Sequence, residues 1–248
     1  MWNYWQGSLD AEIMVIGQDF GIFPQKQDKL TEKQKRNKRY YSYKQYIQGK
    51  AWRQDVDLSK TKNYWGATDA NLISLFWEGL EIDITKPQEK LFFTNMACCY
   101  RQNMISGSSN FRQEWLSLCA NKYMGELIEI IRPKLIIALG ENVWNAFGCI
   151  ESARLICKDM ISKNEIVKVS GFQESIQHTY QLNFETGFQV RVFPVYHPGA
   201  YSTVNRPMYR ADVTTGNEAD KGKKKREGCQ IEDWKKIKDY YESSCRTN

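Results

Sequence analysis

Four short apolar runs stand out along the chain, and each has the pattern of a buried strand. None of them alternates cleanly between apolar and polar residues, which is typical of strands covered on both faces. Between and after these runs, apolar residues recur every three or four positions, and this spacing predicts helices over 68–80, 111–131, 141–147 and 231–241. The alternation of strands and helices favours one α/β domain around a mostly parallel sheet. The predicted strands are Glu12–Gly17, Lys90–Asn95, Lys134–Gly140 and Val190–Gly199.

Three segments depart from this pattern. Residues 26–50 are basic and rich in tyrosine, and residues 214–228 are polar and carry the run KGKKKR at 221–226. We expect both to be excursions from the surface of a single domain that spans residues 1–248. Residues 152–188 are ambiguous, and the pattern leaves open a helix and a β-hairpin there.

The composition is that of a globular protein with a weakly basic surface. Hydrophobic residues make up 42% of the 248 residues, and the net charge of +6 suits a polyanionic partner without requiring one. No apolar run approaches the roughly 20 residues of a membrane helix, and the first ten residues do not have the pattern of a secretory signal. The seven scattered cysteines indicate reduced thiols. We therefore expect a cytoplasmic protein without membrane contact, and we expect it to act as a monomer.

Polar residues of chemical interest follow three of the four predicted strands. Gln18 and Asp19 come directly after the first strand, Asn95 ends the second, and His197 lies near the end of the fourth. Sites in open parallel sheets form beyond the carboxyl ends of the strands, so we expect an acid, an amide and an imidazole at one edge. The third strand ends in Gly140, which permits a close backbone approach.

Each of these residues also has a purely structural interpretation. Asp19 taken alone is more often a cap than a catalyst, but its expected place beside Asn95 and His197 favours catalysis. Asn95 could form a strand-end turn, or it could read a planar polar edge such as that of uracil, because an amide offers both donors and an acceptor. The only other histidine, His178, receives no role.

The sequence lacks the signatures of phosphate and metal sites. The turn GQDFG at 17–21 contains neither G-x-x-x-x-G-K nor G-x-G-x-x-G. No second histidine stands at a spacing suited to a metal ion. We therefore expect no metal and no cofactor, and a nucleotide-processing hydrolase, which would need such a site, is not favoured.

Five segments, taken together and in order, resemble the uracil-DNA glycosylase superfamily. The resemblance is discontinuous and runs from about Ile13 to Arg206. The first and last segments are similar to the two main motifs of the family, the third and fourth to its bacterial iron–sulfur branch, and the second more loosely to the part that supplies a base-stacking aromatic. The segments are GQDFG (17–21), NYWGATDANL (63–72), FFTNMACCYR (92–101), IRPKLIIALGENVWNAF (131–147) and HPGAY (197–201).

The resemblance implies a fold and a reaction. The fold would be a three-layer α/β/α arrangement with a central, mostly parallel four-stranded sheet and a narrow pocket for one extruded base. The reaction would be hydrolysis of the N-glycosidic bond of uracil, or of other deaminated bases, in DNA during base excision repair, with uracil-containing DNA as the partner. Asp19 would orient the attacking water and stabilise the sugar cation, and His197 would donate a hydrogen bond to O2 of the departing uracil anion.

Other family positions would bind the substrate. Asn95 would read N3 and O4 of uracil, and Tyr64 would stack on the base, with Trp65 as the near alternative. The backbone N–H of Gln18 would help at O2. The substrate-binding residues that the resemblance implies are Gly17, Gln18, Phe20, Gly21, Tyr64 and Asn95.

Two residues near the end of the resemblance are expected to meet DNA. Tyr201 fits equally well a wedge that fills the vacated base stack and an ordinary loop tyrosine. Arg206 is expected to contact DNA. The basic residues of 26–50 and 221–226 would meet phosphates, or they form solvated surface only.

Three departures from the family pattern keep a second hypothesis open. The iron–sulfur branch carries a C-x-x-C before its first motif, but none of the sixteen residues before Gly17 is a cysteine, so we expect no cluster. Gly21 stands where the main uracil-specific branch has the tyrosine that blocks the thymine methyl, so exclusion of thymine would fall to Phe20 or Tyr64. Gly199 replaces the usual serine. The alternative is a non-catalytic protein that holds a nucleic acid or a nucleotide in the same pocket.

Overall fold

The structure, a computed structural model, describes residues 6–18, 67–84, 88–97, 113–158, 171–199, 202, 205–209 and 228–246, with the backbone alone at 67–70 and 245–246. The chain divides into two units. The first unit is Met1–Asp55 with Thr85–Pro194, and the second is Val56–Ile84 with Val195–Asn248. Each unit is described by itself below, and the single domain and the three-layer arrangement stay predictions.

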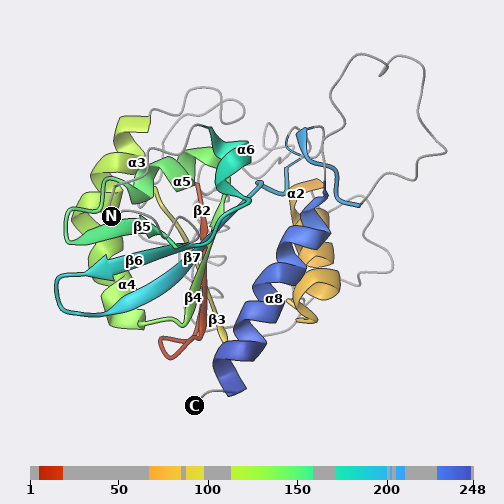
Figure 1. The fold of residues 1–248 in the computed structure, drawn as a ribbon, viewed down its shortest axis with the longest axis horizontal. Coiled ribbons are helices and arrows are strands. Elements are labelled where there is room, and N and C mark those ends of the chain that lie inside the picture. The colour runs from red at the N-terminus through yellow and green to blue at the C-terminus, as the bar shows by residue number, and fades with distance from the viewer. Residues whose placement is uncertain are drawn as a thin grey trace, which may run out of the picture. The chain divides into compact units, whose positions relative to one another are not determined.

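The first unit is built on a seven-stranded sheet with the order β1-β3-β2-β4-β7-β6-β5 (Figure 1). Its last strand extends by one residue beyond the boundary of the unit. The strands are β1 (Gln6–Gly7), β2 (Ile13–Gly17), β3 (Leu91–Asn95), β4 (Leu135–Leu139), β5 (Ala153–Cys157), β6 (Tyr180–Phe184) and β7 (Gln189–Val195).

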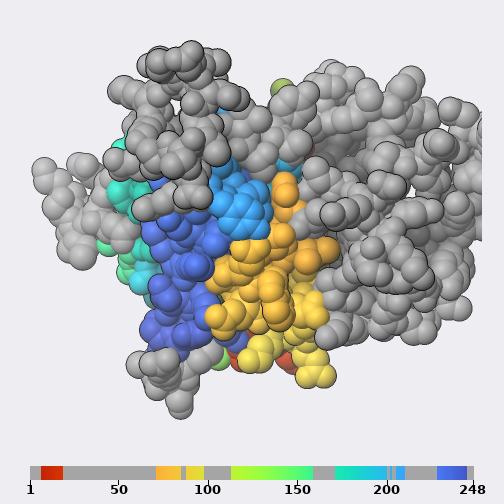
Figure 2. Space-filling view, turned by 90° about the vertical axis from the view of Figure 1, so that its right-hand side faces the viewer, coloured from red at the N-terminus to blue at the C-terminus, as the bar shows by residue number. Residues whose placement is uncertain are grey.

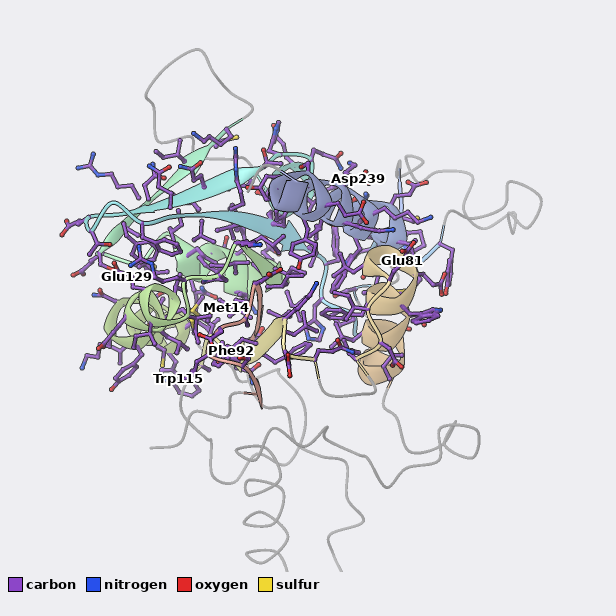
Figure 3. The ribbon with its side chains drawn as sticks, turned by 90° about the horizontal axis from the view of Figure 1, so that it is seen from below. Met14, Glu81, Phe92, Trp115, Glu129 and Asp239 are labelled. Carbon is purple, nitrogen blue, oxygen red and sulfur yellow. The ribbon has the colours of Figure 1, made fainter. Side chains whose placement is uncertain are left out.

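The centre of the sheet confirms the predicted parallel pairing. β2 lies between β3 and β4 and is parallel to both. All five residues of β4 are buried, and so are the first four of β2, as expected for strands covered on both faces. Met14 pairs with Phe92 across β2 and β3, and Figure 3 labels this pair near the middle of the sheet. Register and burial together bring Gly17 opposite Asn95 at the carboxyl edge.

The prediction of four strands is wrong, because six strands have five or more residues and β1 adds a short seventh. The missing strands come from the ambiguous segment and from the amino terminus. β5 pairs antiparallel with β6, β6 with β7, and β1 with β3. The turn from β6 to β7 uses Gly187 at a φ of 85°, where a side chain would be strained. Exposed positions alternate with less exposed ones along β5, and Arg154 interrupts its apolar residues, which hid the strand from a search for continuous apolar runs.

The helices of the first unit follow the predicted spans, with one difference. The span predicted as one helix is α3 (Gln113–Cys119), the π-helical turn η5 (Ala120–Met124) and α4 (Gly125–Ile131) in direct succession. The helix α5 (Glu141–Phe147) packs against α3 and β4, and the short α6 (Phe172–Ser175) precedes β6. Figure 3 labels Trp115 of α3 and Glu129 of α4 on this helical stretch.

The second unit pairs two helical stretches. The helix α2 (Ala67–Ser74) continues into the π-helical turn η3 (Leu75–Leu80), and α8 (Gln230–Arg246) packs along η3 (Figure 2). The rings of Phe76 and Trp234 meet edge to face at 4.9 Å, and both side chains are fully buried. A Cβ on Gly79 would lie 2.5 Å from the Trp234 Cβ, so only glycine permits this close approach. Among the described residues, no helix is long and apolar enough to span a membrane.

Candidate active site

The carboxyl edge of the first unit's sheet holds Gln18 through its backbone. β2 and β3 remain hydrogen-bonded just beyond their ends, because Met96 N donates to Gly17 O at 2.7 Å and Ala97 N donates to Gln18 O at 2.9 Å. The backbone that leads to the predicted catalytic turn is therefore fixed to the neighbouring strand up to Gln18.

Position 17 requires glycine because the Asn95 side chain leaves no room for a Cβ there. A Cβ at this position would lie 2.5 Å from Oδ1 of Asn95, and its backbone is not in the left-handed region. The Asn95 side chain thus occupies the room that any larger residue would take. The turn glycine and the asparagine form one structural feature, although they lie 78 positions apart in the sequence.

The Asn95 amide is available to a ligand. Its side chain is half-buried, and no hydrogen bond to it occurs within the described part of the chain. Beside it, Thr94 is buried, and its hydroxyl has no hydrogen-bond partner there either. An amide at the edge of a sheet with open donors and acceptor can bind a planar group that presents the complementary pair.

Asn142 joins this edge, and the sequence analysis did not single it out. Its Nδ2 donates to Oε1 of Gln18 at 2.8 Å, and its carbonyl oxygen accepts a hydrogen bond from Gln113 Nε2 at 3.1 Å. The residue lies in the first turn of α5, which Gly140 opens with a φ of 95°. The sequence could have pointed to Asn142, because a glycine that ends a strand and begins a helix places the side chains that follow it at the edge of the sheet.

His197 belongs to the second unit, two residues after β7 ends. The backbone N–H of Gly199 donates to its Nδ1 at 3.0 Å. A ring nitrogen that accepts a hydrogen bond carries no proton, so the neutral imidazole presents N–H at Nε2. Asn71 of α2 holds the same turn, because its Nδ2 donates to Pro198 O at 2.7 Å. Gly199 stands where the family usually has serine, and its contact with the histidine is made by its backbone N–H.

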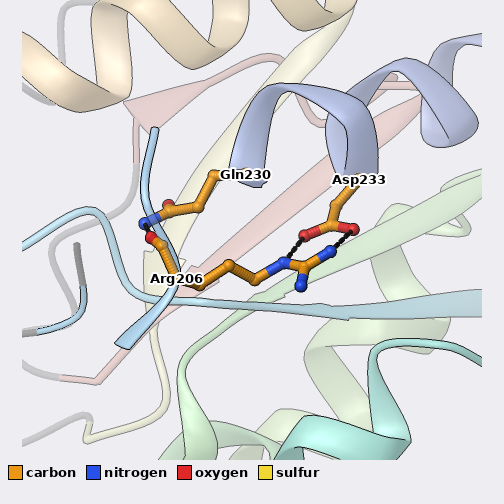
Figure 4. A network of polar contacts seen from close by, with 3 residues as sticks. All are labelled: Arg206, Gln230 and Asp233. Carbon is orange, nitrogen blue, oxygen red and sulfur yellow. Dashed lines mark hydrogen bonds and ion pairs between the residues drawn. The ribbon is translucent and has the colours of Figure 1, made fainter. Parts of the chain in front are cut away.

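Arg206, which the sequence analysis expects to contact DNA, is buried and paired with an acidic side chain. Its side chain is 4% exposed, and its guanidinium donates to both oxygens of Asp233, from Nε at 2.5 Å and from a terminal nitrogen at 2.6 Å (Figure 4). A guanidinium that is buried and bidentately paired has no free face for a phosphate. Burial raises the pKa of Asp233 above its ordinary value, and the hydrogen bonds from Arg206 offset part of that rise.

The segment after Arg206 is also fixed to η3. The Tyr209 hydroxyl donates to Oε1 of Glu78 at 2.5 Å. That hydrogen bond, together with partial burial, raises the pKa of the Tyr209 hydroxyl. Tyr209 is therefore a neutral donor over the ordinary pH range.

Several predicted site residues lie outside the described part of the chain. They are Asp19, Phe20, Gly21, Tyr64 and Tyr201, together with the basic segments 26–50 and 221–226. Among the predicted residues that are described, the first unit brings together Gly17, Gln18 and Asn95, and the second holds His197 and Arg206. Within the described residues, no group of three histidine, cysteine or acidic side chains could hold a metal ion.

The chain was compared with known proteins. A family model described as the uracil DNA glycosylase superfamily matches residues 4–218, which is most of the chain. No curated protein matches the chain.

Proposed function

The chain belongs to the uracil-DNA glycosylase superfamily, and from this premise we propose that it hydrolyses the N-glycosidic bond between uracil and deoxyribose in DNA. The product would be an abasic site for base excision repair. No cofactor enters the proposed reaction, and the enzyme would be monofunctional, acting as a cytoplasmic monomer.

The arrangement of Asn95 over Gly17 is the observation that carries this proposal. Uracil presents N3–H as a donor and O4 as an acceptor, and a fixed amide offers an acceptor and a donor in the matching order. Cytosine presents the reverse order, so discrimination against it requires neighbouring groups that prevent the amide from flipping. No hydrogen bond to the Asn95 amide occurs within the described part of the chain, which is compatible with this role.

The state of His197 supports a role at the leaving group. Cleavage of the glycosidic bond leaves negative charge on uracil, and a donor aimed at O2 stabilises that charge as it develops. The hydrogen bond from Gly199 to Nδ1 leaves the proton on Nε2. A neutral imidazole with its proton on Nε2 has the donor that this role requires.

The rest of the proposed mechanism follows the family resemblance. Asp19 would orient the attacking water and stabilise the sugar cation. The Gln18 backbone N–H would assist at O2, and Tyr64, or Trp65 beside it, would stack on the base. The base would reach the site by flipping out of the duplex, with Tyr201 filling the vacated stack.

Phe20, Gly21 and the basic segments complete the proposal. Gly21 lacks the bulk that would exclude the thymine methyl, so Phe20 or Tyr64 would have to exclude thymine from the pocket. Lysines and arginines of 26–50 and 221–226 would meet phosphates, which makes the affinity for DNA fall with salt.

A cleavage assay on oligonucleotides that carry uracil, a thymine mismatch, hypoxanthine or xanthine tests the proposal. The wild type is expected to leave an abasic site in place of uracil, and Asp19→Asn, Asn95→Ala and His197→Ala are each expected to lose rate while the fold is kept. Two matched controls, Asn145→Ala on the exposed face of α5 and His178→Ala, should retain the wild-type rate. Tight binding of uracil-containing DNA without cleavage at low salt would instead establish the binding-protein hypothesis.

A further inference from the structure

We propose that Arg206 and Asp233 are positioning residues for His197, so that the start of α8 belongs to the catalytic apparatus. This inference rests on the proposed role of His197 and deepens it. It gives the buried ion pair a function other than the phosphate contact expected from the sequence.

A continuous series of hydrogen bonds leads from the histidine to the arginine. Gly199 N donates to His197 Nδ1 at 3.0 Å, and Ser202 N donates to Gly199 O at 3.0 Å. Arg206 N then donates to Ser202 O at 2.8 Å. Each bond joins the residue that anchors the previous one, so a displacement of Arg206 would be passed to the N–H that holds the imidazole.

The start of α8 forms several hydrogen bonds with the segment at Arg206, where this series ends. Gln230 Nε2 donates to Arg206 O at 2.8 Å, and Gln230 N donates to Pro207 O at 2.9 Å. Arg206 also donates twice to Asp233, one turn further along the helix. Gly228, at a φ of 85°, leaves room for the guanidinium, because a Cβ there would lie 2.6 Å from a terminal nitrogen of Arg206.

The helix α8 packs closely against η3, so it can hold the Arg206 segment in a fixed position. Trp234 packs edge to face on Phe76 of η3, next to the Gly79 contact. On the other side of the loop, Asn71 of α2 holds Pro198 O at 2.7 Å. The loop that carries the histidine is thus tied to α2 near one end and to α8 near the other.

The chemistry of the pair favours positioning over stability. A buried ion pair contributes little net stability compared with apolar residues of similar volume, because both charges must leave water. The planar guanidinium and the carboxylate, joined by two parallel bonds, fix an angle as well as a distance. An apolar pair would fill the same space without fixing the orientation of the loop.

The double variant Arg206→Met with Asp233→Leu separates these roles, because it removes both charges and keeps the volume. We expect it to fold, to lose about 10- to 100-fold in kcat for uracil excision through misplacement of the histidine, and to keep KM within about twofold. The matched control is Glu81→Gln, which removes a solvent-facing ion pair between η3 and Lys238 of α8 and should leave kcat unchanged. A wild-type kcat in the folded double variant would overturn the proposal.

The salt dependence of KM distinguishes positioning from a phosphate contact. A lost phosphate contact reduces the slope of log KM against log salt by about 0.9, whereas a positioning pair leaves it unchanged. A reduced slope in the folded double variant, which has lost the positive charge, would overturn the proposal. Arg206→Lys keeps the charge but not the two parallel bonds, so it should lose kcat, and a wild-type kcat in Arg206→Lys would overturn the proposal where the double variant fails to fold.

A readout that needs no activity keeps this inference distinct from the proposed function. The chain has two histidines, so imidazole nitrogen NMR on histidine-labelled protein gives two assignable spin systems. We expect the wild-type His197 ring to be the single Nε2–H tautomer, and the Arg206 variants to show a mixture of tautomers. An inactive wild type would refute the glycosylase proposal, while an unchanged His197 tautomer in the Arg206 variants would refute the positioning role.

Discussion

Replacing Gly17 with alanine is expected to disable base recognition while the protein stays folded. The new methyl group would lie 2.5 Å from Oδ1 of Asn95, whereas ordinary contact begins at 3.4 Å. The amide must therefore move by about 0.9 Å, the difference between these two distances. A hydrogen bond to the base does not survive such a displacement, because its geometry tolerates only a few tenths of an ångström.

The magnitude follows from the two hydrogen bonds that Asn95 would make with uracil. At about 0.5–1.5 kcal/mol each, their loss amounts to roughly 1–3 kcal/mol, or about a 5- to 150-fold fall in kcat/KM. The stability should change by less than about 1 kcal/mol, because the reduced entropy of the unfolded chain offsets the cost of moving a flexible side chain.

Two further glycines make this prediction refutable. Gly79→Ala has the same 2.5 Å clearance, but its neighbour is the buried Trp234 Cβ, so it should destabilise the fold by about 1–3 kcal/mol. Gly148→Ala meets only an atom at 3.6 Å and should change neither property. Urea unfolding and single-turnover kinetics measure both quantities. A Gly17→Ala protein with wild-type kcat/KM, or one destabilised as strongly as Gly79→Ala, would refute the reasoning.

Two further predictions concern polar pairs. Arg206→Met is expected to cost about 3–5 kcal/mol at neutral pH, and less near pH 4. Burial raises the pKa of Asp233, so the folded state favours the protonated carboxyl and stability is lost as the pH rises through the folded pKa; equal losses in urea unfolding at both pH values would contradict this. Asn142→Ala is expected to raise KM by about 2- to 10-fold, because it frees the Gln18 amide, while Asn145→Ala leaves KM unchanged; equal KM values for both variants would remove Asn142 from the site.

The sequence predicted the centre of the fold well because the relevant signals were local. Continuous apolar runs marked β2, β3 and β4, and the glycine after β4 marked the start of α5. The strands β5 and β6 escaped because their exposed or polar positions interrupt the apolar runs, and their partners are fixed only by tertiary pairing.

The candidate site was predicted only in part, for a similar reason. Asn95 and His197 follow strands, so their places could be argued from the ends of those strands. The ion pair of Arg206 could not be predicted, because its partner, Asp233, lies 27 positions away on a helix that no local signal connects to it. Asn142 was missed because its contact with Gln18 spans 124 positions.

The base choice of the wild-type protein tests the central claim most directly. Single-turnover assays would compare release of the free base from otherwise identical oligonucleotides that carry uracil or cytosine at one position. The Asn95 amide predicts release of uracil with an equal amount of abasic product and no detectable release of cytosine. No release of uracil at high enzyme and low salt, or equal release of both bases, would contradict the account.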